Sequence, residues 1–323
     1  MRRGPVRLSL CMTVKNEAAA VTDLARDLRG QQLAPDEIVI TDGGSTDGTL
    51  DVLERQLRDL APLELISVPG ANIAAGRNRA IREASGRLIA VADAGLRLPP
   101  TWLRSLAEAL EEDPSLDVAF GYVLSRPQNL FETVLGVVTL PVAGKIAPDR
   151  YMPSAGCVAF RGELFERYCY PEWLDYGEDL HLDLRWRADG LKLGHVEGAD
   201  VGFRPRGSLA AFFAQYLHYA EGDGVAGMRP GRHAIRYGAY AAGALLLVLA
   251  RRCPFALVPL LTAGAWYLRN PYRRLLPALG GLGAGDRLLA LAMVPPIRAT
   301  GDLAKMLGFI RGLLKARGVR PSR

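Results

Sequence analysis

Short apolar segments alternate with helical stretches from residue 6 to residue 92, in units of about 30 residues. The apolar segments occupy residues 6–14, 37–41, 63–68 and 87–92, and helical periodicity fills the intervals. This alternation favours a parallel, doubly wound α/β sheet that is covered on both faces. Ligands bind such sheets beyond the carboxyl ends of the strands. The loops at 14–17, 42–48, 69–77 and 93–98 are therefore expected to line one crevice.

The pattern is more mixed beyond residue 92. Strands are predicted at residues 117–124 and 156–161, and helices at 128–138, from Gly162 onward, and at 178–188. The last of these begins with Glu178-Asp179, which the helix dipole alone could explain as a capping feature.

The charge balance changes sharply near residue 204. Residues 204–323 hold 18 basic and 4 acidic side chains, whereas the whole chain has 40 and 34. A basic tail can face nucleic acid or an anionic membrane surface. Apolar residues make up 49% of the chain, which excludes a disordered protein. The four cysteines form no C-x-x-C pair, which excludes a readable zinc ribbon or disulfide framework and fits a reducing compartment.

Two uncharged runs in the tail decide between these partners. Gly238–Ala250 and Pro254–Leu268 flank Arg251-Arg252, and arginines bracket the pair on both outer sides. Each run is shorter than the ~20 residues that span a bilayer, so two tilted short spans and a re-entrant hairpin both fit, and a buried soluble hairpin is the alternative. Residues 288–310, with Pro295-Pro296 and several charges, are expected to form one or two interfacial helices. No signal-peptide pattern is visible, so the first part is expected in the cytoplasm.

Asp42 and Asp47 lie in the polar loop that follows the second strand. A carboxylate beyond a buried strand is well placed to accept hydrogen bonds from a ligand, and we favour that interpretation for Asp42. Turn formation and helix capping explain Asp47 better.

Four stretches together resemble a known family. They are Thr13–Glu17 (TVKNE), Asp36–Thr49 (DEIVITDGGSTDGT), Gly76–Asn78 (GRN) and Asp93, followed by Glu178-Asp179. Their order and spacing resemble an inverting family 2 glycosyltransferase of GT-A fold, over about residues 7–224. The resemblance implies a GT-A glycosyltransferase domain at 1–224 and a membrane-associated helical region at 225–323.

The resemblance also assigns roles to single residues. Asp179 matches the catalytic base, and Glu178 precedes it on the acceptor side. The nucleotide-sugar donor is expected to contact Thr13, Lys15, Glu17, Asp42, Arg77, Asn78 and Asp93. Gln215 and Tyr219 occupy the place of the Q-x-x-R-W motif of polymer-forming members and are expected near the acceptor. Because His218 and Tyr219 replace its Arg and Trp, polymer synthesis is not predicted.

The chain departs from the family where a metal would bind. The family usually has Asp-x-Asp where this chain has Asp93-Ala94-Gly95, and it often has a histidine where this chain has Phe203-Arg204. One carboxylate is a poor site for Mg²⁺ or Mn²⁺, so at most a weakly held cation is predicted. Guanidinium groups of Arg204 and Arg206, and less directly Arg97, are expected to neutralise the donor diphosphate instead.

These observations predict an enzyme that transfers one sugar from a nucleotide-diphosphate donor to a lipid-linked or membrane-embedded acceptor, with inversion. It is expected at the cell inner membrane, with its catalytic domain in the cytoplasm. The alternative is a catalytically inactive GT-A-like module that binds a nucleotide sugar or a membrane partner, which Gly95 favours. Nucleic-acid binding is not predicted, because the arginines bracket apolar runs without a stacking groove.

Overall fold

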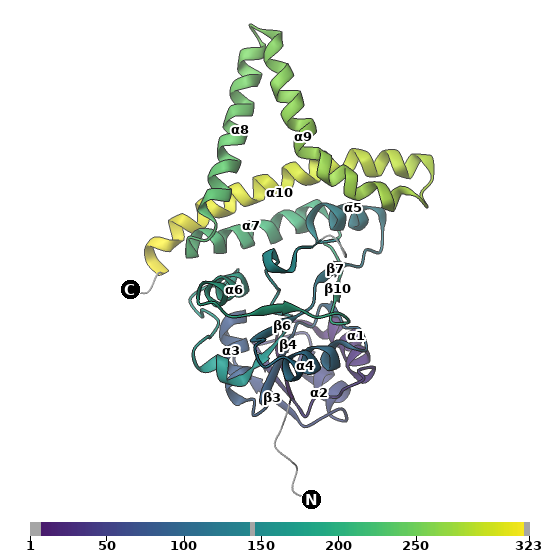
Figure 1. The fold of residues 1–323 in the computed structure, drawn as a ribbon, viewed down its shortest axis with the longest axis vertical. Helices are drawn as coiled ribbons and strands as arrows, with labels where there is room; N and C mark the ends of the chain where they lie inside the picture. Colours follow the sequence, from purple (N-terminus) through teal and green to yellow (C-terminus); the bar gives the residue numbers. More distant parts are fainter. Residues whose placement is uncertain (1–7, 143–145, 320–323) are drawn as a thin grey trace, which may run out of the picture. The chain divides into compact units, whose positions relative to one another are not determined.

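The computed structural model describes residues 8–142 and 146–319, and the chain forms two compact units (Figure 1). The sheet unit comprises residues 1–124 and 143–204, and the helical unit comprises residues 125–142 and 205–323. The predicted domain boundary at residues 224 and 225 therefore falls inside the helical unit, which also takes in a segment from the first half of the chain.

A seven-stranded mixed sheet forms the centre of the sheet unit, in the order β3-β2-β1-β4-β8-β6-β9. The first four strands are parallel, as the alternation predicts, and β8 runs antiparallel to both β4 and β6. A second sheet has the order β5-β10-β7. The strands are β1 (Leu8–Val14), β2 (Glu37–Asp42), β3 (Leu63–Ser67), β4 (Leu88–Ala92), β5 (Leu96–Arg97), β6 (Val118–Phe120), β7 (Val123–Ser125), β8 (Cys157–Arg161), β9 (Leu193–His195) and β10 (Val201–Phe203).

Alternate residues of the strands point to two separate hydrophobic cores. Leu10 and Met12 of β1 face a core completed by α1, α2 and α4, whereas Cys11 faces a core completed by α3 and α6. The helices are α1 (Ala18–Arg29), α2 (Thr49–Leu57), α3 (Ile73–Glu83), α4 (Trp102–Glu112) and α6 (Glu178–Ala188). Helices thus cover both faces of the sheet, and loops leave its carboxyl edge.

Two sequence-based expectations differ from the structure in this unit. The single strand expected at 117–124 is divided into β6 and β7, which belong to different sheets, and between them the backbone at Gly121 passes too close to the Ala199 carbonyl for any side chain. The helix expected from Gly162 is a short 3₁₀ segment, Gly162–Glu166. The sequence reasoning also did not predict α4.

The helical unit is built around two long helices, α7 (Leu209–Ala226) and α10 (Ala284–Val319). Their backbones touch where Gly308 and Gly312 of α10 meet Leu217, Glu221 and Gly224 of α7. A separate core unites α5 (Leu130–Thr139) with α7, α10 and α9 (Leu257–Leu275), which explains why residues 125–142 belong to this unit. Of the one or two helices expected at residues 288–310, the structure forms one, because α10 continues through both Pro295 and Pro296.

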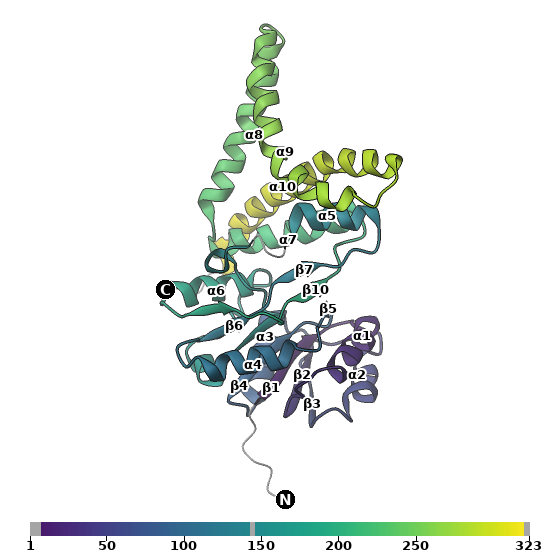
Figure 2. The same ribbon diagram turned by 45° about the vertical axis from the view of Figure 1, so that its right-hand side comes forward.

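A helical hairpin leaves this core (Figure 2). It consists of α8 (Pro230–Ala250), a turn that includes the 3₁₀ segment Pro254–Ala256, and α9. Large apolar side chains cover it and remain exposed, among them Leu245, Leu247, Val248, Leu249, Phe255, Val258, Leu261 and Trp266. Among the helices that the structure describes, α8 alone is long and apolar enough to cross a membrane, with 6% of its most apolar window buried.

Candidate active site

The first two loops at the carboxyl edge of the sheet are locked together. Asp42 ends β2 beside Val14 of β1, and its carboxylate accepts hydrogen bonds from the backbone N–H groups of Gly44 and Ser45. The Ser45 hydroxyl also donates to Asp42, at 2.5 Å. The Asp42 side chain is buried within its own loop in this structure, where it shapes the turn.

Asp47 is a capping residue, as the sequence predicts. Its carboxylate accepts hydrogen bonds from the N–H of Ala18, at the start of α1, and from the N–H and hydroxyl of Thr49, at the start of α2. These bonds lower the pKa of Asp47 below its ordinary value. Asn16 adds a second tie, because its backbone N–H donates to Ser45 while its side chain accepts from Thr46.

Arg77 is brought to the site by the close approach of α3 to the strand ends. At Gly76 any side chain would collide with Thr13 and press on Thr41, and the Thr41 hydroxyl donates to the Gly76 carbonyl at 2.9 Å. A glycine is therefore required one residue before Arg77. The predicted donor residue Thr13 takes part in this packing.

The Arg77 guanidinium connects two carboxylates from distant parts of the chain. It is 5% exposed and lies 2.9 Å from Asp93, which follows β4, and 2.5 Å from Glu178, which begins α6. Its Cζ atom also lies 5.4 Å from the centre of the Tyr170 ring. Asp93 is the most exposed of the three charged groups, with 36% of its side chain accessible.

Asp179 lies beside this cluster, in the first turn of α6. Its carboxylate accepts a hydrogen bond from the Leu180 N–H at 2.7 Å. Burial raises the pKa of Asp179, and Arg77 opposes the shift. Burial, reinforced by the Asp179 charge, raises the pKa of Glu178 to about 7. The cluster therefore holds two acidic groups that bind protons more strongly than ordinary carboxylates do.

The side-chain amide and oxygen of Asn78 both form hydrogen bonds within the protein. Its amide donates to the Tyr170 carbonyl and to Glu172, both at 2.8 Å, and its oxygen accepts from the Tyr170 N–H. These bonds hold the segment that leads to α6. The predicted contact of Asn78 with a donor stays a prediction, and the structure gives it a positioning role.

Gly95 lies next to a predicted arginine. Strand β10 pairs antiparallel with β5 so that Phe203 is opposite Leu96. Gly95 precedes β5 and Arg204 follows β10 at this paired end, and a side chain at Gly95 would meet nothing within 4 Å. Arg97, by contrast, forms ion pairs with Asp23 at 2.6 Å and with Asp27 at 3.0 Å on α1. Its charge is already compensated.

The remaining predicted residues lie outside the cluster of Arg77, Asp93 and Glu178. Lys15 and Glu17 lie in the first loop, where the Glu17 backbone N–H donates a hydrogen bond to the Thr49 hydroxyl at 2.9 Å. Arg206 belongs to the helical unit, as do Gln215 and Tyr219 on α7, where the Gln215 amide donates to the Tyr219 hydroxyl at 2.8 Å.

The residues present fit a bound metal poorly. Among the described side chains, no three His, Cys, Asp or Glu residues gather in a group that could hold an ion. Asp93 offers one carboxylate, which Arg77 already binds, and hard cations need several oxygen ligands.

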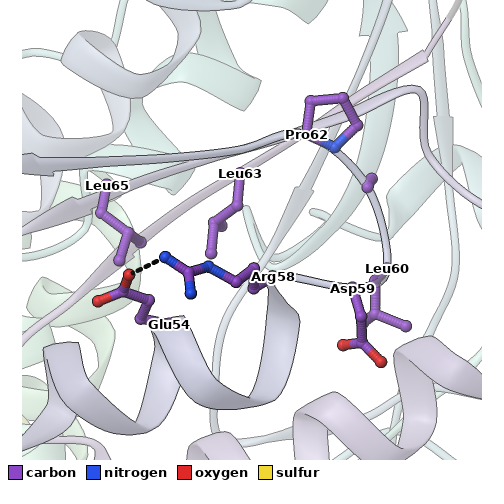
Figure 3. A pocket seen from close by; sticks show the side chains of 8 residues that line it. Glu54, Arg58, Asp59, Leu60, Pro62, Leu63 and Leu65 are labelled. Carbon is purple, nitrogen blue, oxygen red and sulfur yellow. Dashed lines mark hydrogen bonds and ion pairs between the residues drawn. The ribbon is translucent and has the colours of Figure 1, made fainter.

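A surface hollow lies elsewhere on the sheet unit (Figure 3). Residues 58–63, together with Glu54 and Leu65, line it, and Arg58 forms an ion pair with Glu54 at 2.8 Å. It opens at the start of β3, which is the amino end of a parallel strand, whereas Asp42 and Asp93 follow carboxyl ends. It is separate from the candidate site.

Sequence reasoning missed three residues that support the site. Tyr170 stacks on Arg77, Glu172 binds both Asn78 and Arg82, and the Gly156 backbone passes beside Asp93 with no space for a side chain. Their positions depend on β8 running antiparallel beside β4, which no local pattern indicates. In the sequence, only the polar loop before Glu178 could have indicated that Tyr170 and Glu172 lie near the site.

Comparison with known proteins indicates the family of the first half of the chain. Residues 9–167 match the family model of glycosyl transferase family 2. The chain is 27% identical over 222 residues to the succinoglycan biosynthesis protein ExoA of Rhizobium meliloti, covering 64% of this chain and 66% of that protein. It is 25% identical over 109 residues to a cholesterol galactosyltransferase of Borreliella burgdorferi, covering 34% and 30% respectively. The matched stretches thus span less than two-thirds of either relative.

A solved structure shares the fold. A mannosyltransferase from Pyrobaculum calidifontis, in complex with GDP-Man and Mn²⁺, superimposes with a TM-score of 0.54 at 21% identity, covering 98% of this chain and 88% of that chain. Residues 9–167 therefore match glycosyl transferase family 2, and they contribute to a mixed α/β domain of GT-A type.

Proposed function

We propose that the protein transfers a glycosyl group from a nucleotide-diphosphate sugar to a lipid-linked or membrane-embedded acceptor, with inversion. One observation carries the proposal: Arg77 joins Asp93, beyond a strand of the nucleotide-binding edge, to Glu178 at the start of α6, beside Asp179. The family match supports the donor class, and the exposed apolar hairpin supports the membrane acceptor.

Asp179 acts as the general base in this proposal. An inverting displacement needs one group that takes the proton of the acceptor hydroxyl as the new bond forms. Burial raises the pKa of Asp179, which makes its carboxylate a stronger base than a solvated aspartate. Glu178 is held by Arg77 at 2.5 Å and is therefore a positioning residue.

Arg204 neutralises the leaving diphosphate. Arg204 follows β10 at the end where Phe203 pairs with Leu96, one residue after Gly95, and this supports the proposal because the family usually supplies a second metal-binding carboxylate at the Gly95 position. A fixed guanidinium can stabilise charge that develops on phosphate oxygens. We therefore propose weak or absent dependence on Mg²⁺ or Mn²⁺, although the related fold was solved with Mn²⁺.

The helical unit would hold the enzyme against the cytoplasmic leaflet of the inner membrane. Apolar side chains cover its hairpin, and basic residues surround it: residues 204–323 carry 18 basic against 4 acidic side chains. Basic residues near membrane segments favour the cytoplasmic side and anionic lipids.

The test is a transfer assay with a panel of radiolabelled nucleotide sugars and lipid extracts, using the full chain in membranes. We expect transfer from at least one donor, and an inverted anomeric configuration in the product by NMR. Asp179→Asn should lower the rate by about 10²–10⁴-fold, because the amide has the same shape but takes no proton. Donor binding should stay nearly unchanged.

Glu166→Gln is the matched control, because Glu166 is an exposed carboxylate of the same unit. Wild-type turnover in Asp179→Asn would show that Asp179 is not the general base. Donor binding without transfer to any acceptor would favour the inactive binding module instead.

A further inference from the structure

One face of α10 concentrates charge inside the helical unit. Arg298, Asp302 and Lys305 follow one another at spacings of four and three residues, which places them on the same side of the helix. Side chains of α7, α8 and α9 surround this face: Tyr216, Arg236, Tyr240 and Tyr267.

The single carboxylate of this face is already occupied. Asp302 is 6% exposed and receives the Arg236 Nε at 3.0 Å, the Tyr240 hydroxyl at 3.2 Å and the Tyr267 hydroxyl. One acidic group therefore serves one arginine and two tyrosines.

The two cations on either side of Asp302 have no acidic partner. The Arg298 Cζ lies 4.4 Å from the centre of the Tyr267 ring, and the Lys305 Nζ lies 4.6 Å from that of Tyr216. The Arg298 Nε is buried without a hydrogen-bond acceptor. Within the part of the chain that the structure describes, neither cation lies within ion-pair distance of a carboxylate.

Two other cations on the same helix do have an acidic partner. Arg311 and Lys315 both form ion pairs with Glu221, a buried residue of α7. Burial lowers the pKa of Lys305 to about 8; the nearby charges of Arg236 and Arg298 add to this shift, and those of Asp302 and Asp223 oppose it. Partly burying cations without a carboxylate at ion-pair distance is costly, which favours an anion as a further component of this face.

We propose that Arg298 and Lys305 bind the phosphate group of a membrane lipid between α7, α9 and α10. A guanidinium fork and an ammonium group are the side chains that bind phosphate oxygens most strongly. Tyrosine is enriched at the headgroup level of bilayers, where a lipid phosphate lies. The proposal rests on the proposed function only for the membrane location of this unit.

The ligand can come from two sources with the same chemistry. One is the diphosphate of a lipid-linked acceptor, and the other is the headgroup of an anionic phospholipid. The experiment therefore measures binding of farnesyl diphosphate and of phosphatidylglycerol to the purified full chain in detergent micelles, with farnesol as the phosphate-free control. No sugar donor is present, so failure of transfer and failure of this site are distinguished.

The test variant is Arg298→Gln/Lys305→Gln. We expect binding of the phosphate-bearing lipid to weaken by at least about tenfold, because each charge-assisted hydrogen bond is worth roughly that factor or more. Arg232→Gln/Arg273→Gln removes the same charge from exposed positions of α8 and α9 and should bind like the wild type. Arg298→Lys/Lys305→Arg keeps both charges and should retain most of the affinity.

Thermal unfolding without lipid separates a binding role from a structural one. The double glutamine variant should be at least as stable as the wild type, because it removes two mutually repelling charges. Preference for farnesyl diphosphate would identify an acceptor site, and equal binding of phosphatidylglycerol would identify a headgroup site; both support the proposal. Unchanged binding of both lipids in the double glutamine variant, or equal binding of farnesol by the wild type, would overturn it.

Discussion

Arg77 shows how one residue serves both fold and site. The family resemblance predicts it as a donor-binding residue, and the structure buries its guanidinium between Asp93 and Glu178. Breaking a buried ion pair costs about 3–5 kcal/mol, because the remaining charge loses its partner. Arg77 therefore fixes the distance between the carboxyl edge of the sheet and the start of α6, whatever it contacts in a bound donor.

The Glu178 carboxyl should make stability fall as pH rises. Burial raises its pKa to about 7 from the ordinary 4.5, so the folded protein keeps a proton that the unfolded chain releases in this window. Stability then decreases as pH rises from about 4.5 to about 7. Glu178→Gln should flatten this slope in thermal unfolding followed by tryptophan fluorescence. Glu166→Gln should leave it unchanged, and equal slopes in wild type and Glu178→Gln would contradict the assignment.

Arg204 should carry the role that a metal has in many relatives. We expect transfer to continue in the presence of a chelator and Arg204→Ala to lower kcat by about 10²–10³-fold, the usual cost of losing one charge-stabilising group. Arg87→Ala is the control, because Arg87 is exposed at the amino end of β4. Gly95→Asp meets no steric obstacle and should make transfer respond to Mn²⁺. Complete loss of wild-type activity with chelator, restored by Mn²⁺, would refute this role.

Motif residues were predictable, and their partners were not. Asp93, Arg77 and Glu178 were placed at one site because strand ends and a family pattern mark them. The pattern did not reveal that the side chains of Asn78 and Asp42 accept hydrogen bonds from backbone N–H groups of the protein itself. Such bonds depend on which backbone groups lie nearby, and that follows from tertiary structure.

At the scale of elements, local periodicity predicted β1–β4 and α1–α3 to within a few residues. It did not predict that β8 enters the sheet antiparallel, or that α5 leaves the sheet unit to pack with α7, α9 and α10. Both depend on contacts between segments far apart in the chain. The sequence left one helix or two open at residues 288–310, and the structure forms a single helix, α10, which packs on α7.

Contact between the backbones of α7 and α10 should make Gly312 intolerant of substitution. A side chain there would collide with the Glu221 carbonyl and lie 2.8 Å from the Gly224 Cα. Gly312→Ala should therefore destabilise the protein by about 1–3 kcal/mol, although alanine favours helix by about 1 kcal/mol. Gly238→Ala, in the interior of α8 with nothing within 4 Å, should be neutral or stabilising. Thermal unfolding in micelles measures both, and equal effects would show that the two helices do not pack this closely.

At the scale of the whole chain, the hairpin turn should reach the membrane face opposite the cytoplasm. Helix α8 has 21 residues and a length of about 31 Å, close to the thickness of the hydrocarbon core. Leaving Arg251 and Arg252 inside the bilayer would cost about 2.5–3.5 kcal/mol each, so the far headgroups are the favoured place for the turn.

Cys253 lies in that turn and is the one fully exposed cysteine of the four. A membrane-impermeant maleimide should label it in intact cells, and Cys253→Ser should abolish the labelling. Cys11 and Cys157 are buried, so they should react only after denaturation. Labelling of Cys253 only after the cells are permeabilised would instead establish a re-entrant hairpin, in which the turn stays on the side of the sheet unit.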